Sequence, residues 1–526
     1  MAGVWTIILQ HSSHILGITL GTVFLWQLLL AGYNLFLHPL RKFPGPVLQR
    51  ASPLVWAWQH ASGHQAFRTQ QHHDRYGPIV RIGPNHLTFT NANAWREIYG
   101  FQIGKELDDN ELPKARLFST TVETLPRSIV NADREEHQRF RRALSHGFSD
   151  SSMRAQEVII AKYIDKLILR LHEASDGKDA AALNMEAWYN WTTFDIAGDL
   201  IFGQSFNCLE HANYHPWIAF ILRSIRINAF TTALKYIGLK PLLQRLYMLG
   251  GLAAMSRLRE CIDEMMKARL SMANNRKDLF EGMLKKKEEW NLSFDTLSAN
   301  GLILVLAGSE TTATTLAGTT YLLASHPESM KKLNEEVRSA FTNSGEITIN
   351  SVCKLPYMLA VLNEALRLYP PVTSGLIREV PESGCHIASE HIPKGVSLIH
   401  AQSVGLTEKR KMADGAPVQR HLLRFNSGRL IIARITGLGL GSSGLNVSWT
   451  TKKGSTIAWT LYNRSALAYA EMRLVLARIV YDFDMKLAEG NGPWIERQRV
   501  FGLWDRIPLM VNLKPVGLER LKGPRN

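Results

Sequence analysis

The sequence predicts a mainly α-helical fold with a minor β part, attached to a membrane by an N-terminal helix. Three observations support this prediction. Apolar residues recur with helical spacing over most of the chain, one short stretch alternates as strands do, and the first 40 residues contain no Lys, Arg, Asp or Glu. Of the 526 residues 45% are hydrophobic and 20% are charged, which is typical of a globular protein with a large core.

The N-terminal segment is predicted to cross a membrane. Residues 15–37 form a nearly continuous apolar run, and about 20 such residues span a bilayer as a helix. The alternative is a cleaved signal peptide, which would have a shorter apolar region with basic residues before it. Here Arg41 and Lys42 follow the run, so the positive-inside rule places the rest of the chain in the cytosol. We expect residues 1–42 to form a membrane anchor and residues 43–526 one catalytic domain.

The elements after the anchor can be predicted in order. Residues 43–46 (Phe-Pro-Gly-Pro) break any helix and are expected to form a stiff hinge. Residues 79–90 alternate around Gly83-Pro84-Asn85 and predict a two-stranded hairpin. No repeat or low-complexity linker follows. The predicted helices cover residues 133–147, 151–174, 183–204, 250–275, 294–325, 328–341 and 356–369.

Charge and cysteine content limit the partners. The formal net charge of +15 favours attraction to anionic surfaces, but no basic run is long enough for a nucleic-acid tail. We therefore expect a membrane and an acidic protein as partners and no nucleic acid. The four cysteines, Cys208, Cys261, Cys353 and Cys385, show no metal-ligand spacing, which argues against a zinc site or a disulfide framework and for a reducing compartment.

One predicted helix carries unusual chemistry. Between residues 301 and 325 the only charged residue is Glu310, so this helix is expected to be buried on all sides. A second membrane span is the alternative, although a central carboxylate is costly in lipid. Gly308 and neighbouring hydroxyl groups are expected to loosen the helix locally, because hydroxyls compete for backbone carbonyls. The result would be a groove lined by an acid and an alcohol, Glu310 and Thr311, a pair suited to delivering protons to a bound oxidant.

A second signal is the spacing of Glu364 and Arg367. They lie three residues apart on the helix that ends before Pro370 and Pro371, so they face the same side. An ordinary surface ion pair is the alternative, and the motif alone does not exclude it.

These motifs together resemble the cytochrome P450 family. Residues 307–312 (Ala-Gly-Ser-Glu-Thr-Thr), then Glu364-Ala-Leu-Arg367, then Pro370-Pro371-Val372 and Arg378 occur in the family's order and separation. The anchor with its proline-rich hinge is similar to that of microsomal members, and residues 43–100 and 133–150 are similar to fungal ones. The resemblance covers about residues 15–400 and 465–515.

The resemblance implies a fold, a cofactor and a reaction. It implies a P450-like fold that binds haem and inserts oxygen from O2 into a lipophilic small molecule, in fungal secondary metabolism. Electrons would come from NADPH-cytochrome P450 reductase, to whose acidic surface the basic chain is suited. The resemblance also implies a single-pass protein of the endoplasmic reticulum membrane with a cytosolic catalytic domain. Regions near residues 105–130 and 205–240 would contact the substrate.

The resemblance also assigns roles to residues. Glu310 and Thr311 match the acid and alcohol that relay protons to iron-bound dioxygen. Glu364 and Arg367 match a pair that braces the core next to the haem. For His137 the alternative is a solvated histidine on a basic helix. The residues matched to haem contacts are Ala307, Gly308, His137, Arg141 and Arg378, of which the last three would contact the propionates.

The family's ligand loop is not found. It has the form FxxGxxxCxG before a helix that is recognisable here at residues 466–474, and its cysteine thiolate is the axial iron ligand. Counting back from that helix, the four defining positions hold Ser455, Ala458, Tyr462 and Arg464. The whole block 404–464 is aberrant, as a shifted reading frame or a retained intron would make it.

Other readings of this block are weaker. Tyr462 stands at the cysteine position, and tyrosinate does ligate haem in catalases, but the loop lacks its glycines. Cys385 lies in a hairpin-like segment far from the loop. Residues 439–444 match GxGxxG formally, yet no helix pattern follows as a dinucleotide site requires.

Three hypotheses follow. The first is a monooxygenase whose true sequence contains the cysteine loop. The second is a catalytically inactive P450-like membrane protein without the axial cysteine, and the third is a haem-free scaffold at the membrane.

Overall fold

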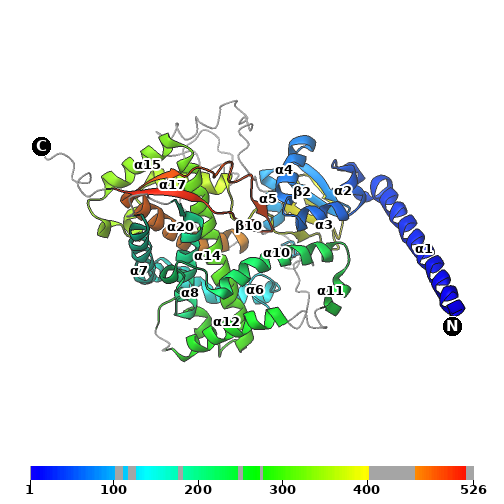
Figure 1. The fold of residues 1–526 in the computed structure, drawn as a ribbon, viewed down its shortest axis with the longest axis horizontal. Helices are drawn as coiled ribbons and strands as arrows, with labels where there is room; N and C mark the ends of the chain where they lie inside the picture. The colour runs from blue at the N-terminus through cyan, green and yellow to red at the C-terminus, as the bar shows by residue number, and fades with distance from the viewer. Residues whose placement is uncertain are drawn as a thin grey trace. The chain divides into compact units, whose positions relative to one another are not determined.

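The computed structural model describes residues 2–100, 111–115, 126–175, 182–246, 253–272, 276–401 and 456–516. Within these residues the chain is mainly helical with four small sheets, which confirms the predicted fold class (Figure 1). The chain divides into two compact units. The first contains Met1–Leu117, Phe230–Leu239 and Gly375–Ala401, and the second contains Phe118–Ala229, Lys240–Ser374 and Gln402–Asn526.

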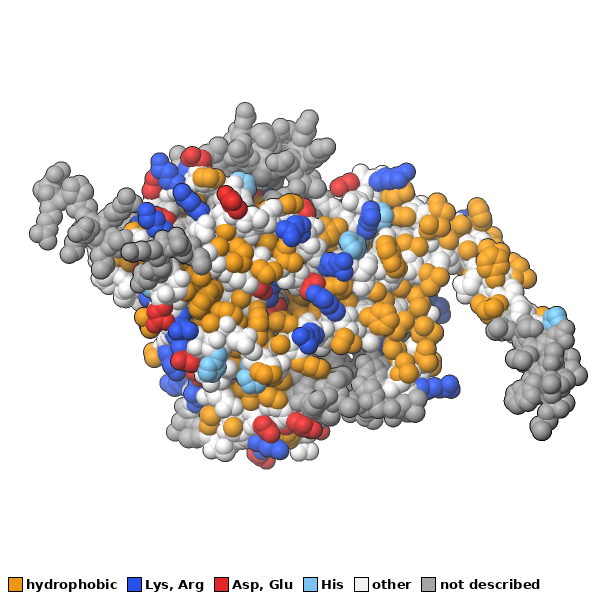
Figure 2. Space-filling view, in the orientation of Figure 1, with side chains coloured by type: hydrophobic (Ala, Val, Ile, Leu, Met, Phe, Trp, Pro, Cys, Tyr) orange, Lys and Arg blue, Asp and Glu red, His pale blue; other side chains and the backbone are white. Residues whose placement is uncertain are grey.

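Helix α1 (Ala2–Gly32) is the predicted anchor and belongs to the first unit. Among the described helices, only the stretch Gly17–Leu37 is long and apolar enough to cross a membrane. Its side chains are largely exposed and hydrophobic (Figure 2). Such a helix fits a bilayer better than water, which supports membrane anchoring.

The end of the anchor is bonded to the globular part of the first unit. A π-helical turn, η1 (Tyr33–Leu37), and a 3-10 turn, η2 (Pro39–Lys42), follow α1. Arg81 Nη1 donates to the Asn34 carbonyl oxygen at 2.9 Å, and Asn34 Nδ2 donates to the Ala51 carbonyl oxygen at 2.9 Å. His38 Nε2 lies 2.8 Å from Asn85 Oδ1. Side chains therefore hold the anchor in place before the chain reaches the proline-rich hinge.

The first unit is built on a four-stranded sheet of order β1-β2-β7-β4. The predicted hairpin is confirmed, because β1 pairs with β2 antiparallel, and β2 pairs with β7 in parallel. The strands are β1 (Ile79–Gly83), β2 (His86–Phe89), β4 (Arg378–Glu379) and β7 (Ser397–His400), with a separate hairpin of β5 (Cys385–Ile387) and β6 (Glu390–Ile392). The helices are α2 (Val47–Ala51), α3 (Leu54–Ala61), α4 (Gln65–Tyr76) and α5 (Ala92–Tyr99).

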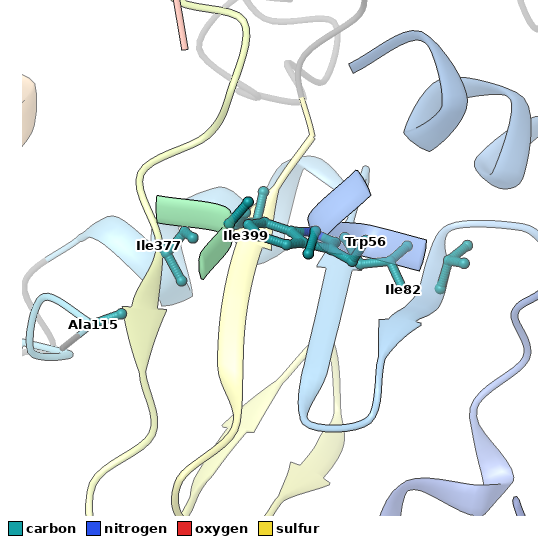
Figure 3. Packing of buried hydrophobic residues seen from close by; sticks show 8 residues of the cluster. Trp56, Ile82, Ala115, Ile377 and Ile399 are labelled. Atoms are coloured by element: carbon teal, nitrogen blue, oxygen red, sulfur yellow. The ribbon is translucent and has the colours of Figure 1, made fainter. Parts of the chain in front are cut away.

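The core of the first unit lies between this sheet and the short helices. Trp56 from α3 packs with Ile82, Ile377 and Ile399, which come from three distant parts of the sequence (Figure 3). Burial of such side chains contributes about 1.5–3 kcal/mol each. This packing fixes the strand that carries Arg378.

The second unit holds most of the helices. They are α6 (Arg134–Ser145), α7 (Asp150–Ser175), α8 (Met185–Phe202), α9 (Cys208–His211), most of α10 (Pro216–Tyr236), α11 (Lys240–Leu246), α12 (Ala253–Ser271), α13 (Glu281–Lys285), α14 (Phe294–Ala324), α15 (Pro327–Ala340), α16 (Ile349–Val352), α17 (Pro356–Leu368) and α20 (Thr456–Asp482). Its sheets join β3 (Leu183–Asn184), β11 (Met510–Pro515) and β8 (Phe483–Leu487), and β9 (Arg499–Val500) with β10 (Trp504–Asp505).

Helix α14 is the central element of the second unit. It packs along α8 and also contacts α12, α15, α17 and α20. Most of its residues are therefore buried in protein, which argues against the alternative of a second membrane span. Helix α8 ends at Gly203, whose φ of 73° is the left-handed conformation that glycine adopts without strain.

Candidate active site

Helix α14 carries the predicted acid and alcohol. Its first turn is fixed by Ser293, whose hydroxyl accepts a hydrogen bond from the Thr296 amide. In the middle of this buried helix Gly308 is exposed, and Ala307 and Thr311 are half-buried. A Cβ atom added to Gly308 would meet nothing within 4 Å. Ala307, Gly308 and Thr311 thus form one accessible side of α14, which we call the open face.

The hydroxyl groups of α14 bond to its own backbone, as the sequence predicts. Thr311 Oγ1 donates to the Ala307 carbonyl oxygen at 2.8 Å, and Ser309 Oγ donates to the Val305 carbonyl oxygen at 2.7 Å. The expected loosening of the helix is not found, because α14 is continuous α-helix from Phe294 to Ala324. The opening comes instead from the missing side chain of Gly308.

Glu310 points into the interior of the second unit. Its side chain is 2% exposed, and Arg506 Nη2 donates to its Oε2 at 2.8 Å. The other carboxylate oxygen, Oε1, is buried and has no hydrogen-bond partner. Arg506 is itself 3% exposed, so this is a buried ion pair.

Arg506 is shared between two carboxylates. Its Nε lies 3.2 Å from Glu186 Oε1 on α8, and its Nη2 also donates to Asn190 Oδ1 at 2.9 Å. Its Nη1 donates to Thr314 Oγ1 at 2.6 Å, one turn beyond Glu310. The guanidinium therefore ties the first turns of α8 to the middle of α14.

Burial and ion pairing shift the pKa values of Glu310, Glu186 and Arg506 in opposite directions. Desolvation raises the pKa of Glu310, and Arg506 only partly counters it. Desolvation likewise raises the pKa of Glu186 to about 7, against the lowering by Arg506. For Arg506 desolvation acts to lower the pKa, but the two carboxylates outweigh it and the net pKa is raised. One cation thus serves two carboxyl groups, each of which binds a proton more readily than in water.

Glu310 and the open face point in different directions. Each residue turns an α-helix by about 100°, so Glu310 lies about 200° from Gly308 around α14. The carboxyl bonds to Arg506, while the Thr311 hydroxyl bonds to a backbone carbonyl. The acid and the alcohol are neighbours on the chain, but in this conformation no hydrogen bond between their side chains is found among the described contacts.

Glu364 and Arg367 form the expected pair on α17. Arg367 Nε and Nη2 donate to the two Glu364 carboxylate oxygens at 2.8 Å and 2.6 Å, and these hydrogen bonds raise the pKa of Arg367. The side chains are 38% and 19% exposed for Arg367 and Glu364. A pair of this exposure contributes about 0–1 kcal/mol by itself, and its role as a brace next to the haem stays a prediction.

The residues matched to propionate contacts lie in both units. His137 and Arg141 are half-buried and stand four residues apart on α6, in the second unit. Arg378 is buried in the first unit, where Nη1 donates to the Leu112 carbonyl oxygen at 3.0 Å and Nη2 lies 3.3 Å from Glu111 Oε1. Desolvation lowers the pKa of Arg378. Groups of the first unit therefore bind Arg378 Nη1 and Nη2, while its buried Nε has no hydrogen-bond partner.

The sequence reasoning missed Arg506, Glu186 and Asn190. Arg506 stands within an apolar stretch, residues 501–511, where a single cation signals a buried partner. Glu186 and Asn190 face the same side of α8 four residues apart, which is also the spacing of a shared site. Neither pattern in the sequence predicts which residue is the partner, because Arg506 lies more than a hundred residues from Glu186 and Asn190.

The positions counted as the ligand loop fall at the start of α20. The backbones of Ala458, Tyr462 and Arg464 belong to this helix, and Ser455 and the GxGxxG stretch lie outside the described residues. The predicted helix at residues 466–474 is confirmed as part of α20.

The resemblance implies haem as the cofactor, and the residues present fit this group only in part. The open face offers small side chains, one hydroxyl and free space at Gly308, which fits a flat macrocycle. The axial sulfur does not fit, because no cysteine follows Cys385 in the sequence. Burial raises the pKa of Cys208 to about 12, which keeps it a thiol. The chain therefore offers one side of a haem site without the thiolate of the other side.

The chain is similar in sequence to proteins of one family. Residues 46–406 match the family model described as Cytochrome P450. The cytochrome P450 monooxygenase tpeC of Talaromyces stipitatus is 42% identical over 93% of this chain and 92% of its own length. The trichothecene C-15 hydroxylase of Fusarium sporotrichioides is 35% identical over 95% and 98%, and the averantin hydroxylase of Dothistroma septosporum is 36% identical over 95% and 91%. The family match ends where the aberrant block begins.

Proposed function

Since the chain belongs to the cytochrome P450 family, we propose that it represents a haem-thiolate monooxygenase that inserts one oxygen atom of O2 into a lipophilic fungal secondary metabolite. The observation that carries this proposal is the open face of α14, with a hydroxyl at Thr311 and space at Gly308. The similarity of the whole chain to fungal monooxygenases and hydroxylases supports it. Two of these relatives are named for the hydroxylation of a trichothecene and of averantin, which supports an organic small molecule as the substrate.

The chain's residues would bind the cofactor and handle protons. Haem, when bound, supplies the oxygen activation for which the family is known. Ala307 and Gly308 would lie against it, and His137, Arg141 and Arg378 would meet its propionates. We assign the holding and supply of protons to Glu310 and Thr311. Glu364 and Arg367 would support the core on the other side of the cofactor.

Location and partners follow from the anchor and the charge. We propose that α1 holds the protein in the endoplasmic reticulum membrane with the catalytic domain in the cytosol. Members of the family receive electrons from a redox partner, here NADPH-cytochrome P450 reductase. The net charge of +15 favours docking to that acidic flavoprotein.

A second candidate function is favoured by the missing cysteine. With Ser455, Ala458, Tyr462 and Arg464 at the loop positions, the chain as written has no thiolate for iron. It would then be a catalytically inactive P450-like membrane protein, which binds haem weakly or with the wrong ligand. A haem-free scaffold is the extreme form of this candidate.

Two measurements separate the candidates. Transcripts across codons 401–466 are sequenced and translated in all frames, and the monooxygenase hypothesis expects FxxGxxxCxG before the helix at residues 466–474. Both the printed chain and any such transcript are then expressed with a reductase, and the reduced carbon monoxide spectrum is recorded. We expect the thiolate-type band only from the transcript with the cysteine. Absence of that pattern from every frame and transcript would refute the monooxygenase hypothesis.

A further inference from the structure

The hairpin of β5 and β6 in the first unit carries two histidines side by side. The strands pair antiparallel, with His386 directly opposite His391. The apolar side chains Cys385, Ile387 and Ile392 are buried, and both histidines are exposed. Because successive side chains of a strand point to opposite faces, the apolar residues cover the core and both imidazoles lie on the solvent face.

The loop of this hairpin sets the distance between the histidines. It consists of Ala388 and Ser389, whose φ values of 51° and 66° are the left-handed conformation that a tight two-residue loop requires. In such a hairpin the strand residues next to the loop exchange backbone hydrogen bonds, so the next pair, His386 and His391, is a non-hydrogen-bonded pair. The side chains of such a pair lie closest together. The Ala388 amide also donates to Glu97 Oε2 on α5 at 2.6 Å, which holds the loop in this strained conformation.

The spacing of the two rings matches that of two ligands of one cation. The ring centroids of His386 and His391 lie 5.1 Å apart, and the ring planes meet at 57°. A zinc ion that one nitrogen of each ring binds at about 2.0–2.1 Å, with a tetrahedral angle between them, separates the centroids by about 5 Å. An ordinary aromatic contact occurs over a range of about 4.5–7 Å, so it is the alternative at this spacing.

The ring nitrogens of the two histidines distinguish a ligand pair from an ordinary contact. Among the described contacts of the chain, each of these imidazoles touches only the other ring, so all four nitrogens lack a hydrogen-bond partner. Other histidines of the first unit, His38 and His73, bond to protein groups through their ring nitrogens. Gly384 leaves room beside the pair, since a Cβ atom added to it would lie 3.0 Å from His391 Cε1. The nitrogens of this pair are therefore accessible and available to a ligand.

We propose that His386 and His391 form a metal site on the hairpin, which binds a divalent transition-metal cation, Zn²⁺ or Cu²⁺, through one nitrogen of each imidazole. Imidazole is a favoured ligand of both ions. Within the described residues no third histidine, cysteine or carboxylate completes a larger cluster, so water fills the other positions of the cation. The site is thus an open surface site that exchanges its cation, unlike a closed structural site with four protein ligands. The inference does not rest on the proposed function.

A bound cation would link β5 to β6 and stabilise the hairpin. Two strands alone are only marginally stable, and a ligand that binds the folded state alone stabilises that state. Glu390, next to His391, forms an ion pair with Lys42 at the end of the turn η2 that follows the anchor. The cation would therefore strengthen a part of the first unit to which the chain after the anchor is tied.

Protection of the histidines from a chemical label tests the site. The full chain in detergent is freed of metal ions with a chelator and treated with diethyl pyrocarbonate, with and without ZnCl₂. The modification of His386 and His391 is followed by mass spectrometry of peptides, which separates them from all other histidines. We expect Zn²⁺ to slow the modification of both residues several-fold. Mg²⁺ should not, because it prefers oxygen ligands.

Three variants complete the test. In His386→Gln the protection of His391 should be lost, and in His391→Gln that of His386, because one imidazole alone holds the cation about tenfold or more weakly than two. His64→Gln, which removes another exposed histidine of the first unit, should leave the protection unchanged. Lack of protection in the wild type, or equal protection of His391 in the wild type and His386→Gln, would overturn the metal site. Both replaced side chains are exposed, so the variants should melt like the wild type when no metal is present.

Discussion

Replacement of Arg506 by methionine should destabilise the second unit in a pH-dependent way. The substitution puts an apolar side chain in place of the guanidinium and leaves both Glu310 and Glu186 buried without their shared counter-ion. Removal of one partner of a buried ion pair costs about 3–5 kcal/mol. Unfolding of the roughly 480 residues after the anchor has an entropy of about 1 kcal/mol per kelvin, since each residue contributes about 2.1 cal/mol per kelvin. The melting temperature should therefore fall by about 3–5 °C.

The pH dependence shows whether the two buried carboxyl groups are responsible. Burial already raises the folded pKa of Glu310 above its unfolded value, and loss of Arg506 raises it further. A group with a raised folded pKa contributes full stability below its unfolded pKa and loses it as pH rises through the folded pKa. The difference between Arg506→Met and the wild type should therefore be larger at pH 8 than at pH 5.

Thermal unfolding of the full chain in detergent, followed by circular dichroism, measures this difference. Arg226→Met is the matched control, because Arg226 pairs with Asp505 but is 64% exposed, so its loss should change the melting temperature by about 1 °C or less. The double variant Arg506→Met/Glu310→Gln should regain part of the lost stability, and the further change Glu186→Gln should regain more, because both glutamates lose their counter-ion. An equal loss at pH 5 and pH 8 would show that neither glutamate is the group left unpaired.

Three further predictions concern other parts of the chain. Deletion of residues 1–42 should move the protein from the membrane pellet to the supernatant in fractionation, because it removes the apolar stretch Gly17–Leu37. A deletion variant that stays in the pellet would point to other membrane contacts. Gly308→Ala should change the melting temperature by about 1 °C or less, whereas Gly318→Ala should lower it by about 1–3 °C, because its new methyl group meets a buried tyrosine ring. Equal effects of the two variants would contradict the open face. Burial lowers the pKa of His86 to about 3, so the first unit should become less stable as pH falls from about 6.5 toward 3. His86→Phe should make the melting temperature depend less on pH over this range.

Helix positions were predictable from the sequence because burial leaves a periodic pattern. The helix predicted at residues 294–325 corresponds to α14 (Phe294–Ala324), and that predicted at 356–369 corresponds to α17 (Pro356–Leu368). Proline at the first helical turn and a serine cap mark these starts in the sequence itself. Helix α10 (Pro216–Tyr236) was not predicted.

The candidate site was predictable only in part. The resemblance and the isolation of Glu310 within an apolar helix indicated α14 as the candidate functional helix. The direction of the Glu310 side chain was not predictable, because it depends on Arg506, which lies 196 residues away along the chain. Spacing within one helix determines which residues share a face, but contacts between distant elements determine which of them meet a partner.

The bonds between the anchor and the first unit limit how the protein can move on a membrane. A body joined through a flexible linker samples many tilts and heights above the lipid. Here Asn34 and His38 at the end of the anchor are tied to Arg81, Ala51 and Asn85. The first unit should therefore keep one orientation relative to the anchor helix, so that a tilt of this helix would turn the first unit with it.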